Sequence, residues 1–218
     1  MQFCRNCIWL LFLSIFSQFR LRNMFNPRIG VFGILMLLFG SSAMGLEVFD
    51  GACPSNMTAV GEFYMDYYVG KWYTYSMYPF LYKKMNKCRT IKIDKLPNGK
   101  FHETMTELHS LKETLIVKKT DIDSVDSKAG KFTLKTSSPA FVGGLDIYVL
   151  VTDYDNFAIQ FLCIDSNYVI NFQYAAILTR QRSPSQTVVF EVQQIAKRLG
   201  IHIDKLKIVP QNGCPPDA

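Results

Sequence analysis

Eight short segments with strand character follow one another between Trp72 and Arg180, and this succession restricts what the chain can fold into. They recur roughly every 8–12 residues between turn residues, which is typical of an all-β barrel. The clearest boundary is Pro97-Asn98-Gly99, because Asn-Gly between two alternating runs is the strongest short-range signal for a β-hairpin. The predicted strands are Lys71–Pro79, Arg89–Leu96, Lys100–His109, Thr114–Thr120, Lys131–Thr136, Leu145–Asp153, Phe157–Cys163 and Tyr168–Thr179.

A change of periodicity after the last predicted strand indicates a helix. It begins beyond Ser183-Pro184-Ser185, where apolar residues recur close to every 3.6 positions, and it ends at Gly200. One face carries Val188, Val192, Ile195 and Leu199. We expect this apolar stripe to pack on the outside of the barrel, and residues 205–210 to form a short final strand.

The first 45 residues differ in composition from the rest of the chain. They contain four arginines and no Asp or Glu. Without those four, the 24 basic residues fall to 20 against 18 acidic ones, so the formal net charge falls from +6 to +2. What remains has no stripe of Lys and Arg that would follow a phosphate backbone. The basic charge therefore gives no indication of a nucleic-acid partner.

The same N-terminal stretch has the order of a signal peptide. The short segment 24–28, which ends in the basic Arg28, precedes the apolar run Ile29–Gly40, and Ala43-Met44-Gly45 fits a small-x-small cleavage site. This run and the earlier one, Ile8–Phe16, are both shorter than the about 20 apolar residues that a helix needs to cross a bilayer. We predict a cleaved leader over 1–45, which starts at Met1 or at Met24, and a mature domain over 46–218. A leader that stays in the membrane is the alternative.

Four cysteines lie outside this leader, and an even number in an extracellular context predicts disulfide bonds. They are Cys53, Cys88, Cys163 and Cys214. Four cysteines allow three pairings, and the sequence alone does not choose among them. A cytosolic protein with free thiols or a zinc site is the alternative, which the lack of any Cys-x-x-Cys spacing disfavours. Asn56-Met57-Thr58 is a sequon and predicts glycosylation of Asn56.

Three small clusters stand in an order that is known from one family. Gly70-Lys71-Trp72 opens the first predicted strand, Thr152-Asp153-Tyr154 forms a tight turn, and Arg180 follows the last strand. With Cys-Pro at residues 53–54, Val-Thr-Asp-Tyr-Asp-Asn-Phe-Ala at 151–158, Ile-Leu-Thr-Arg-Gln-Arg-Ser-Pro at 177–184 and a late Cys-Pro, the chain resembles the lipocalin family over residues 50–216. It is most similar to the branch of apolipoprotein D, the insect bilin-binding proteins and Lazarillo.

The resemblance implies an eight-stranded antiparallel up-and-down lipocalin barrel with a C-terminal helix packed outside it. It also implies the disulfides Cys53–Cys163 and Cys88–Cys214, which would tie both terminal segments to the outer wall. Trp72 and Arg180 would form a barrel floor, with the guanidinium stacked on the indole, instead of a catalytic pair. The other residues of this structural signature are Gly70, Thr152, Asp153 and Tyr154.

The implied disulfides indicate which side chains face into the barrel. A bridge to a terminal segment must leave from the outer surface, so Cys163 points outward and strand alternation turns Ala158, Gln160 and Leu162 inward. Cys88 must also point outward because of its disulfide, so the alternation of its strand places Ile91 and Ile93 inside and Lys92 and Asp94 outside.

Aliphatic patterning and family geometry extend this assignment to other strands. In Leu145–Asp153 the odd-numbered residues are aliphatic and are assigned inward, Val151 included. In the last strand, family geometry brings Arg180 to the barrel floor, and the same alternation places Leu178 inside. Neither face of Lys100–His109 is cleanly apolar, so neither is assigned. The predicted wall of the ligand-binding calyx is Thr74, Ser76, Ile91, Ile93, Ile147, Val149, Ala158, Gln160, Phe172 and Tyr174.

The predicted wall favours ligand binding over a solid core. An eight-stranded barrel is just wide enough to be filled by side chains or to hold one small ligand, and small and polar residues recur on this inner face. The sequence therefore predicts a secreted, monomeric carrier of a small hydrophobic molecule of the fatty-acid, retinoid, sterol, carotenoid, pheromone or bilin class, with no cofactor and no metal.

Two other functions stay open at this point. Two loops would give the open end a hydrophobic rim, which acts as a lid or binds a cell-surface receptor or a membrane. They contain the hydrophobic residues Phe80, Leu81 and Tyr82 and the segment Phe141-Val142-Gly143-Gly144. Three scattered histidines and the absence of known catalytic motifs argue against an enzyme. A prostaglandin-synthase-like activity is the remaining enzymatic alternative. It requires a free, activated thiol, which two disulfides would remove.

Overall fold

The computed structural model describes residues 46–55, 57–79, 85–137 and 141–216. They belong to one compact unit that spans residues 43–218. The predicted leader, the predicted glycosylation site Asn56 and the rim residues Phe80, Leu81 and Tyr82 lie outside the described residues. No helix within the described part is both long enough and apolar enough to cross a bilayer.

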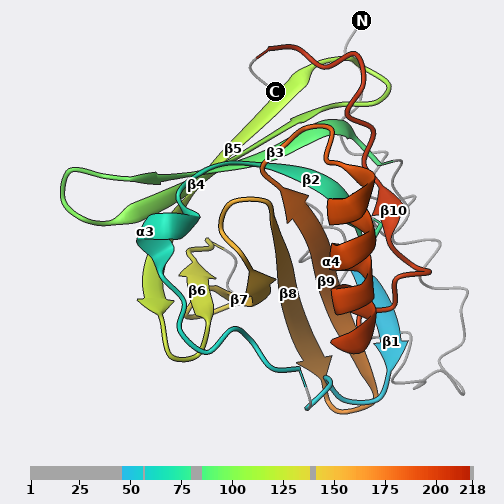
Figure 1. Ribbon diagram of the computed structural model, residues 1–218. Coiled ribbons are helices and arrows are strands. Elements are labelled where there is room, and N and C mark those ends of the chain that lie inside the picture. Colours follow the sequence, from blue (N-terminus) through green and yellow to red (C-terminus); the bar gives the residue numbers. More distant parts are fainter. Residues whose placement is uncertain (1–45, 56, 80–84, 138–140, 217–218) are drawn as a thin grey trace, which may run out of the picture. The chain divides into compact units, whose positions relative to one another are not determined.

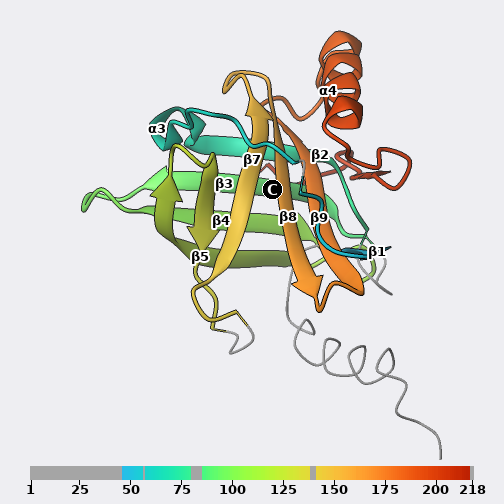
Figure 2. The same cartoon turned by 90° about the horizontal axis from the view of Figure 1, so that it is seen from below.

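A closed antiparallel barrel of eight strands forms the body of this unit (Figure 1). The strands are β2 (Gly70–Met77), β3 (Lys87–Lys95), β4 (Phe101–Leu108), β5 (Leu115–Asp126), β6 (Lys131–Leu134), β7 (Leu145–Thr152), β8 (Phe157–Ser166) and β9 (Ile170–Thr179). Each strand pairs with the next one along the chain, and β9 also pairs with β2, which closes the ring. Figure 2 shows β2–β5 lying across β7–β9. The predicted lipocalin barrel is confirmed.

Local chemistry explains the tight connection between β3 and β4. Gly99 has a φ of +78° at the tip of the β3–β4 hairpin, a conformation that glycine adopts without strain, and its N–H donates to the carbonyl oxygen of Leu96 at 2.9 Å. The predicted strand Thr114–Thr120 continues to Asp126 in the structure. Its extension alternates acidic residues with the buried Ile122, so the strand continues past the point where the sequence looks like a polar loop.

Two short strands extend the sheet beyond the barrel. β10 (Lys207–Ile208) lies within the predicted segment 205–210 and pairs with Met77 and Ser76 of β2. β1 (Glu47–Asp50) pairs with β9 and has no counterpart among the predicted strands. Four residues without clear alternation give no periodic signal, so this strand depends on its partner in the tertiary structure.

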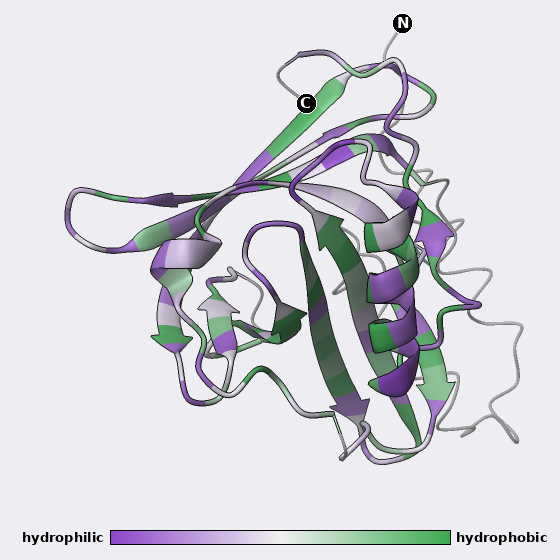
Figure 3. Cartoon of the chain, in the orientation of Figure 1, coloured by the Kyte–Doolittle hydropathy of each residue, from purple (hydrophilic) through white to green (hydrophobic). Residues whose placement is uncertain are grey.

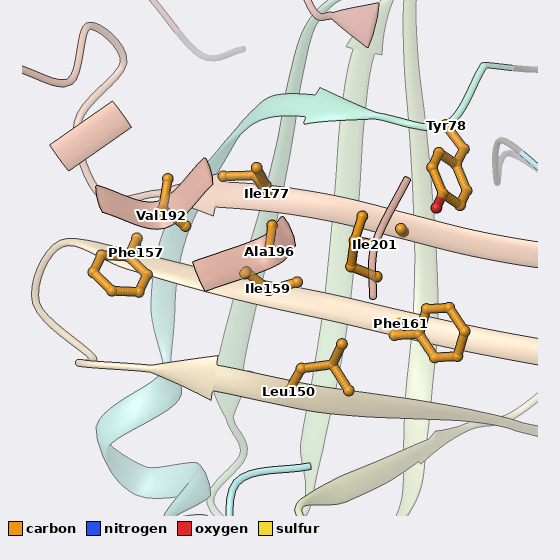
Figure 4. Packing of buried hydrophobic residues seen from close by; sticks show 10 residues of the cluster. Tyr78, Leu150, Phe157, Ile159, Phe161, Ile177, Val192, Ala196 and Ile201 are labelled. Carbon is orange, nitrogen blue, oxygen red and sulfur yellow. The ribbon is translucent and has the colours of Figure 1, made fainter. Parts of the chain in front are cut away.

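The C-terminal helix α4 (Gln186–Arg198) packs on the outer wall, as predicted (Figure 4). The Ser185 hydroxyl accepts from the N–H of Val188 and caps the first turn. Val192 and Ala196 are fully buried in an outer cluster with side chains of β8 and β9, among them Ile159 and Ile177. Figure 3 shows the alternating hydrophobic and hydrophilic faces of this helix beside the largely hydrophobic β8 and β9.

Two β-bulges correct the predicted inner face. In β2 the register shifts between Thr74 and Ser76, which pairs Ser76 with Ile177, a member of the outer cluster. In β7 a shift between Val149 and Val151 pairs Val151 with the outward Ile159. An extra residue in one strand reverses the alternation beyond it, so neither Ser76 nor Val151 continues the inner wall.

Candidate ligand-binding site

The closed end of the barrel is built around Trp72, which is fully buried. The guanidinium carbon of Arg180 lies 3.7 Å from the centre of the indole, a cation–π contact. The one-turn helix α3 (Met65–Tyr68) supplies the Tyr68 carbonyl oxygen that accepts from the indole N–H at 2.9 Å. We name Trp72, Arg180 and α3 the barrel floor.

Backbone carbonyls hold the Arg180 guanidinium in this position. Nε donates to the carbonyl oxygen of Tyr154 at 2.8 Å, Nη1 to that of Lys71 at 3.2 Å and Nη2 to that of Tyr67 at 3.1 Å. A Cβ at Gly70 would lie 3.1 Å from Nη1, and this glycine has a φ of +100°. Glycine at this position therefore both relieves the backbone and leaves room for the guanidinium.

Thr152, Asp153 and Tyr154 build the adjoining turn between β7 and β8. The Asp153 carboxylate accepts from the N–H groups of Asn156 and Phe157, and the Thr152 hydroxyl donates to the carbonyl oxygen of Phe157. The Tyr154 carbonyl accepts from Arg180, which links the turn to the floor. All the signature residues therefore meet at the closed end, in contacts that serve the architecture.

The strand pairings show that most of the predicted wall residues face the interior of the barrel. Val149 pairs with Gln160, Trp72 with Ile91, and Tyr174 with Leu162, so these side chains share the inner face. Nine of the ten predicted wall residues lie on this face, and all are almost fully buried: Thr74, Ile91, Ile93, Ile147, Val149, Ala158, Gln160, Phe172 and Tyr174. Ser76 is the exception, because of the bulge.

A chain of hydrogen bonds crosses the interior near the floor. The Tyr174 hydroxyl donates to Oε1 of Gln160 at 3.2 Å, and Nε2 of Gln160 donates to the Tyr68 hydroxyl at 3.2 Å. Burial raises the pKa of Tyr174 to about 12 and raises that of Tyr68 further, so both phenols stay protonated. Both the oxygen and the nitrogen of the Gln160 amide are thus hydrogen-bonded to tyrosine side chains of the protein.

The strand without an assigned face, β4, contributes two carboxylates to the interior. Glu103 pairs with the inward Ile93, and Glu107 shares its parity along the strand. The carboxylate of Glu107 lies 2.8 Å from Nη1 of Arg89, and both side chains are 4% exposed. Nδ2 of Asn86 donates to the other Glu107 oxygen at 2.7 Å. The interior therefore holds a buried ion pair toward the open end.

Sequence reasoning missed Glu103, Glu107, Arg89 and Tyr68 for identifiable reasons. The inner face of β4 alternates Phe101 and Met105 with the two glutamates, so no apolar stripe marks it. The useful signal was the spacing of Glu103 and Glu107, which places both carboxylates on the same face as Met105. Tyr68 comes from a helical turn before the first barrel strand, where strand alternation gives no direction.

Two disulfides join the terminal segments to the outer wall. Cys53 is bonded to Cys163 and Cys88 to Cys214, the pairing that the resemblance implies. None of these four cysteines is therefore the free thiol that an enzymatic lipocalin would need. Among the described side chains, no group of three or more His, Cys, Asp or Glu stands close enough to hold a metal ion.

The comparison with protein families agrees with this architecture. The model of the Lipocalin / cytosolic fatty-acid binding protein family matches residues 69–213. The chain belongs to the lipocalin family. Members of this family bind small hydrophobic ligands.

Among curated proteins, this lipocalin is similar to apolipoprotein D. Apolipoprotein D of Macaca fascicularis is 27% identical over 187 residues, which cover 82% of this chain and 92% of the relative. That of Cavia porcellus is 26% identical over 189 residues, which cover 84% and 95%. These relatives lie in the branch that the sequence motifs indicate.

Solved structures share the fold of this lipocalin at lower identity. Insecticyanin from the tobacco hornworm Manduca sexta superposes with a TM-score of 0.66 at 20% identity, over 80% of this chain and 92% of that one. H1 crustacyanin from the lobster Homarus americanus gives a TM-score of 0.60 at 19% identity, over 78% and 94%. This likeness concerns the barrel and its attached helix.

Proposed function

We propose that this lipocalin is a secreted, monomeric carrier that binds a small hydrophobic molecule reversibly inside its barrel. The observation that carries the proposal is the inner wall, where aliphatic and aromatic side chains from β2, β3 and β7–β9 surround a few placed polar groups. This is the usual make-up of a site for a small apolar ligand. The fatty-acid binding in the family's description and the name apolipoprotein D of its relatives support a lipid-like ligand.

Secretion forms part of the proposal. Two disulfides suit an oxidising compartment, and the first 45 residues have the order of a cleaved signal peptide. We expect the protein recovered from the medium of expressing cells to begin near Leu46 and to show no reactive thiol after denaturation. N-terminal sequencing and a thiol assay measure both, and a mass shift on glycosidase treatment tests Asn56. A secreted chain that retains residues 20–28 would contradict the cleavage.

Filling the interior should compete with the ligand. Val149 is fully buried on the inner face opposite Gln160, so Val149→Trp places a large ring where the ligand is expected. We expect the affinity for a fluorescent fatty acid and for retinol to fall at least about fivefold, because overpacking a site of fixed size costs about 1–3 kcal/mol. Fluorescence titration measures this loss.

The matched control for this variant is Lys92→Trp. Lys92 is exposed on the outer face of β3, so the same ring added there should leave the affinity nearly unchanged. Equal affinities for Val149→Trp and the wild type would mean that the ligand does not enter the barrel, and the proposal would fail.

A second candidate is contact with a membrane or a receptor through the open end. The observation that favours it is the loop between β6 and β7, where the side chain of Val142 is 94% exposed. Antiparallel alternation places this loop at the end of the barrel opposite Trp72. An apolar side chain presented in this way suits either docking or the entry of a ligand.

A further inference from the structure

Glu103 is a buried carboxylate on the inner wall that the barrel does not pair. Its register partner Ile93 is fully buried on the inner face, and Glu103 itself is 9% exposed. The described residues place no hydrogen-bond donor and no salt-bridge partner within bonding distance of its carboxylate. A buried carboxylate without such partners costs free energy, so its presence calls for a function.

The charged groups that face Glu103 do not neutralise it by contact. Arg89 of β3 is engaged by Glu107 at 2.8 Å, and Lys118 of β5, which is exposed, acts on Glu103 only through its longer-range charge. The other titratable groups near it are the phenols of Tyr68 and Tyr174, whose pKa values the charge of Glu103 raises further. Both phenols are protonated at neutral pH and therefore bring no charge.

The same interior also holds hydroxyl groups with unused capacity. The Thr74 hydroxyl is fully buried on the inner face and has no hydrogen-bond partner. The Tyr68 hydroxyl accepts from Gln160, and no acceptor for its own proton is found among the described residues. The interior therefore offers one unused anionic acceptor and two hydroxyls that can donate.

We propose that Glu103 selects the head group of the ligand, accepting a hydroxyl or N–H donor and rejecting a free carboxylate. This inference rests on the proposed function, because it assumes that the ligand lies inside the barrel. A hydroxyl head donates to Glu103 and accepts from a hydroxyl of the interior such as that of Tyr68, whose phenol lies close enough to feel the charge of Glu103. One group then satisfies both partners. A carboxylate head offers no proton to Glu103, and its negative charge opposes that of Glu103 at close range.

The selection depends on pH in a defined direction. Burial raises the pKa of Glu103 to about 7, although the positive charges of Arg89 and Lys118 oppose the rise. Below this pH Glu103 is a neutral acid that can donate to a carboxylate ligand. Above it Glu103 is negative and repels that ligand, whereas an alcohol still donates to it. The affinity for a carboxylate should therefore fall as the pH rises through 7, and the affinity for an alcohol should not.

The experiment uses two ligands with the same tail, 1-dodecanol and dodecanoate. Each displaces the fluorescent probe N-phenyl-1-naphthylamine from the secreted protein at pH 6 and at pH 8. For the wild type we expect dodecanoate to bind about tenfold more weakly at pH 8, since the protonated fraction of a group with a pKa near 7 falls about tenfold across this range. Dodecanol should change by less than about twofold.

Glu103→Gln keeps the shape and removes the charge. We expect the pH dependence of dodecanoate binding to disappear in this variant and the preference for dodecanol at pH 8 to shrink about tenfold. Glu103→Met serves as a second variant without a charge. Asp121→Asn on the exposed face of β5 is the matched control and should behave as the wild type.

The outcomes separate the two proposals. Displacement by both ligands with equal affinity, or the same pH dependence in Glu103→Gln as in the wild type, overturns the role of Glu103 and leaves the carrier function standing. If dodecanol and dodecanoate both fail to displace the probe from the wild type, the carrier function for such ligands fails and the selection fails with it. The wild-type pH profile needs no variant, so the test does not depend on how a substituted chain folds.

Discussion

Trp72→Ala is expected to lower the free energy of unfolding by about 3–5 kcal/mol, because the indole is fully buried and its removal leaves a cavity in the barrel floor. Arg180→Ala should destabilise by a smaller amount through the loss of the cation–π contact and of three hydrogen bonds to backbone carbonyls. Urea unfolding followed by circular dichroism measures both changes.

The control for these floor variants is Phe190→Ala, because Phe190 lies on α4, outside the floor, and its side chain is 66% exposed. It should change the stability by less than about 1 kcal/mol. The role of the floor as architecture predicts that Trp72→Ala and Arg180→Ala change stability more than ligand preference. Unchanged stability together with abolished ligand binding would show that Trp72 and Arg180 form a binding site instead.

Glu107→Gln is expected to cost about 3–5 kcal/mol, which is typical of breaking a buried ion pair from one side. Arg89 and Glu107 are each 4% exposed, so the substitution removes a negative charge that lies 2.8 Å from the guanidinium in a site shielded from water. Chemical denaturation at neutral pH measures the loss.

Two comparisons isolate the ion pair as the cause. The double variant Arg89→Met, Glu107→Leu removes both charges and should be less destabilised than Glu107→Gln alone, since neither member of the pair is left behind without the other. Asp94→Asn breaks the more exposed pair with Lys92 and should cost less than about 1 kcal/mol. If Glu107→Gln and Asp94→Asn cost the same, solvent reaches the inner pair and the interior is wetter than its burial indicates.

Strand alternation predicted the inner wall wherever both faces of a strand differ clearly. In β3 the exposed Lys92 separates Ile91 from Ile93, and all three lie where the pattern places them. The prediction failed at the bulges, because an extra residue such as Leu150 carries no local signature in a continuous apolar run. Ser76 and Val151 therefore fell on the wrong face although the strands themselves were found.

The polar interior could not be predicted for a different reason. The inner face of β4 contains Glu103 and Glu107, and a buried carboxylate looks in sequence like a solvated one. Only the tertiary structure brings Arg89 to Glu107 and leaves Glu103 without such a partner. Tyr68 and Gln160 meet across 92 positions of sequence, a separation at which no local pattern operates.

The seam where the barrel closes has a consequence for the behaviour of the protein in solution. β9 pairs with β2 only over Ala176–Thr179, and its other half, Ile170–Gln173, is covered by β1. β10 likewise covers Ser76 and Met77 of β2, beyond the residues that pair with β3. Uncovered, these strand edges would be templates for pairing with another molecule. β1 and β10 thus protect the protein against aggregation, and a proteolytic cut after Asp50 would open one of these edges.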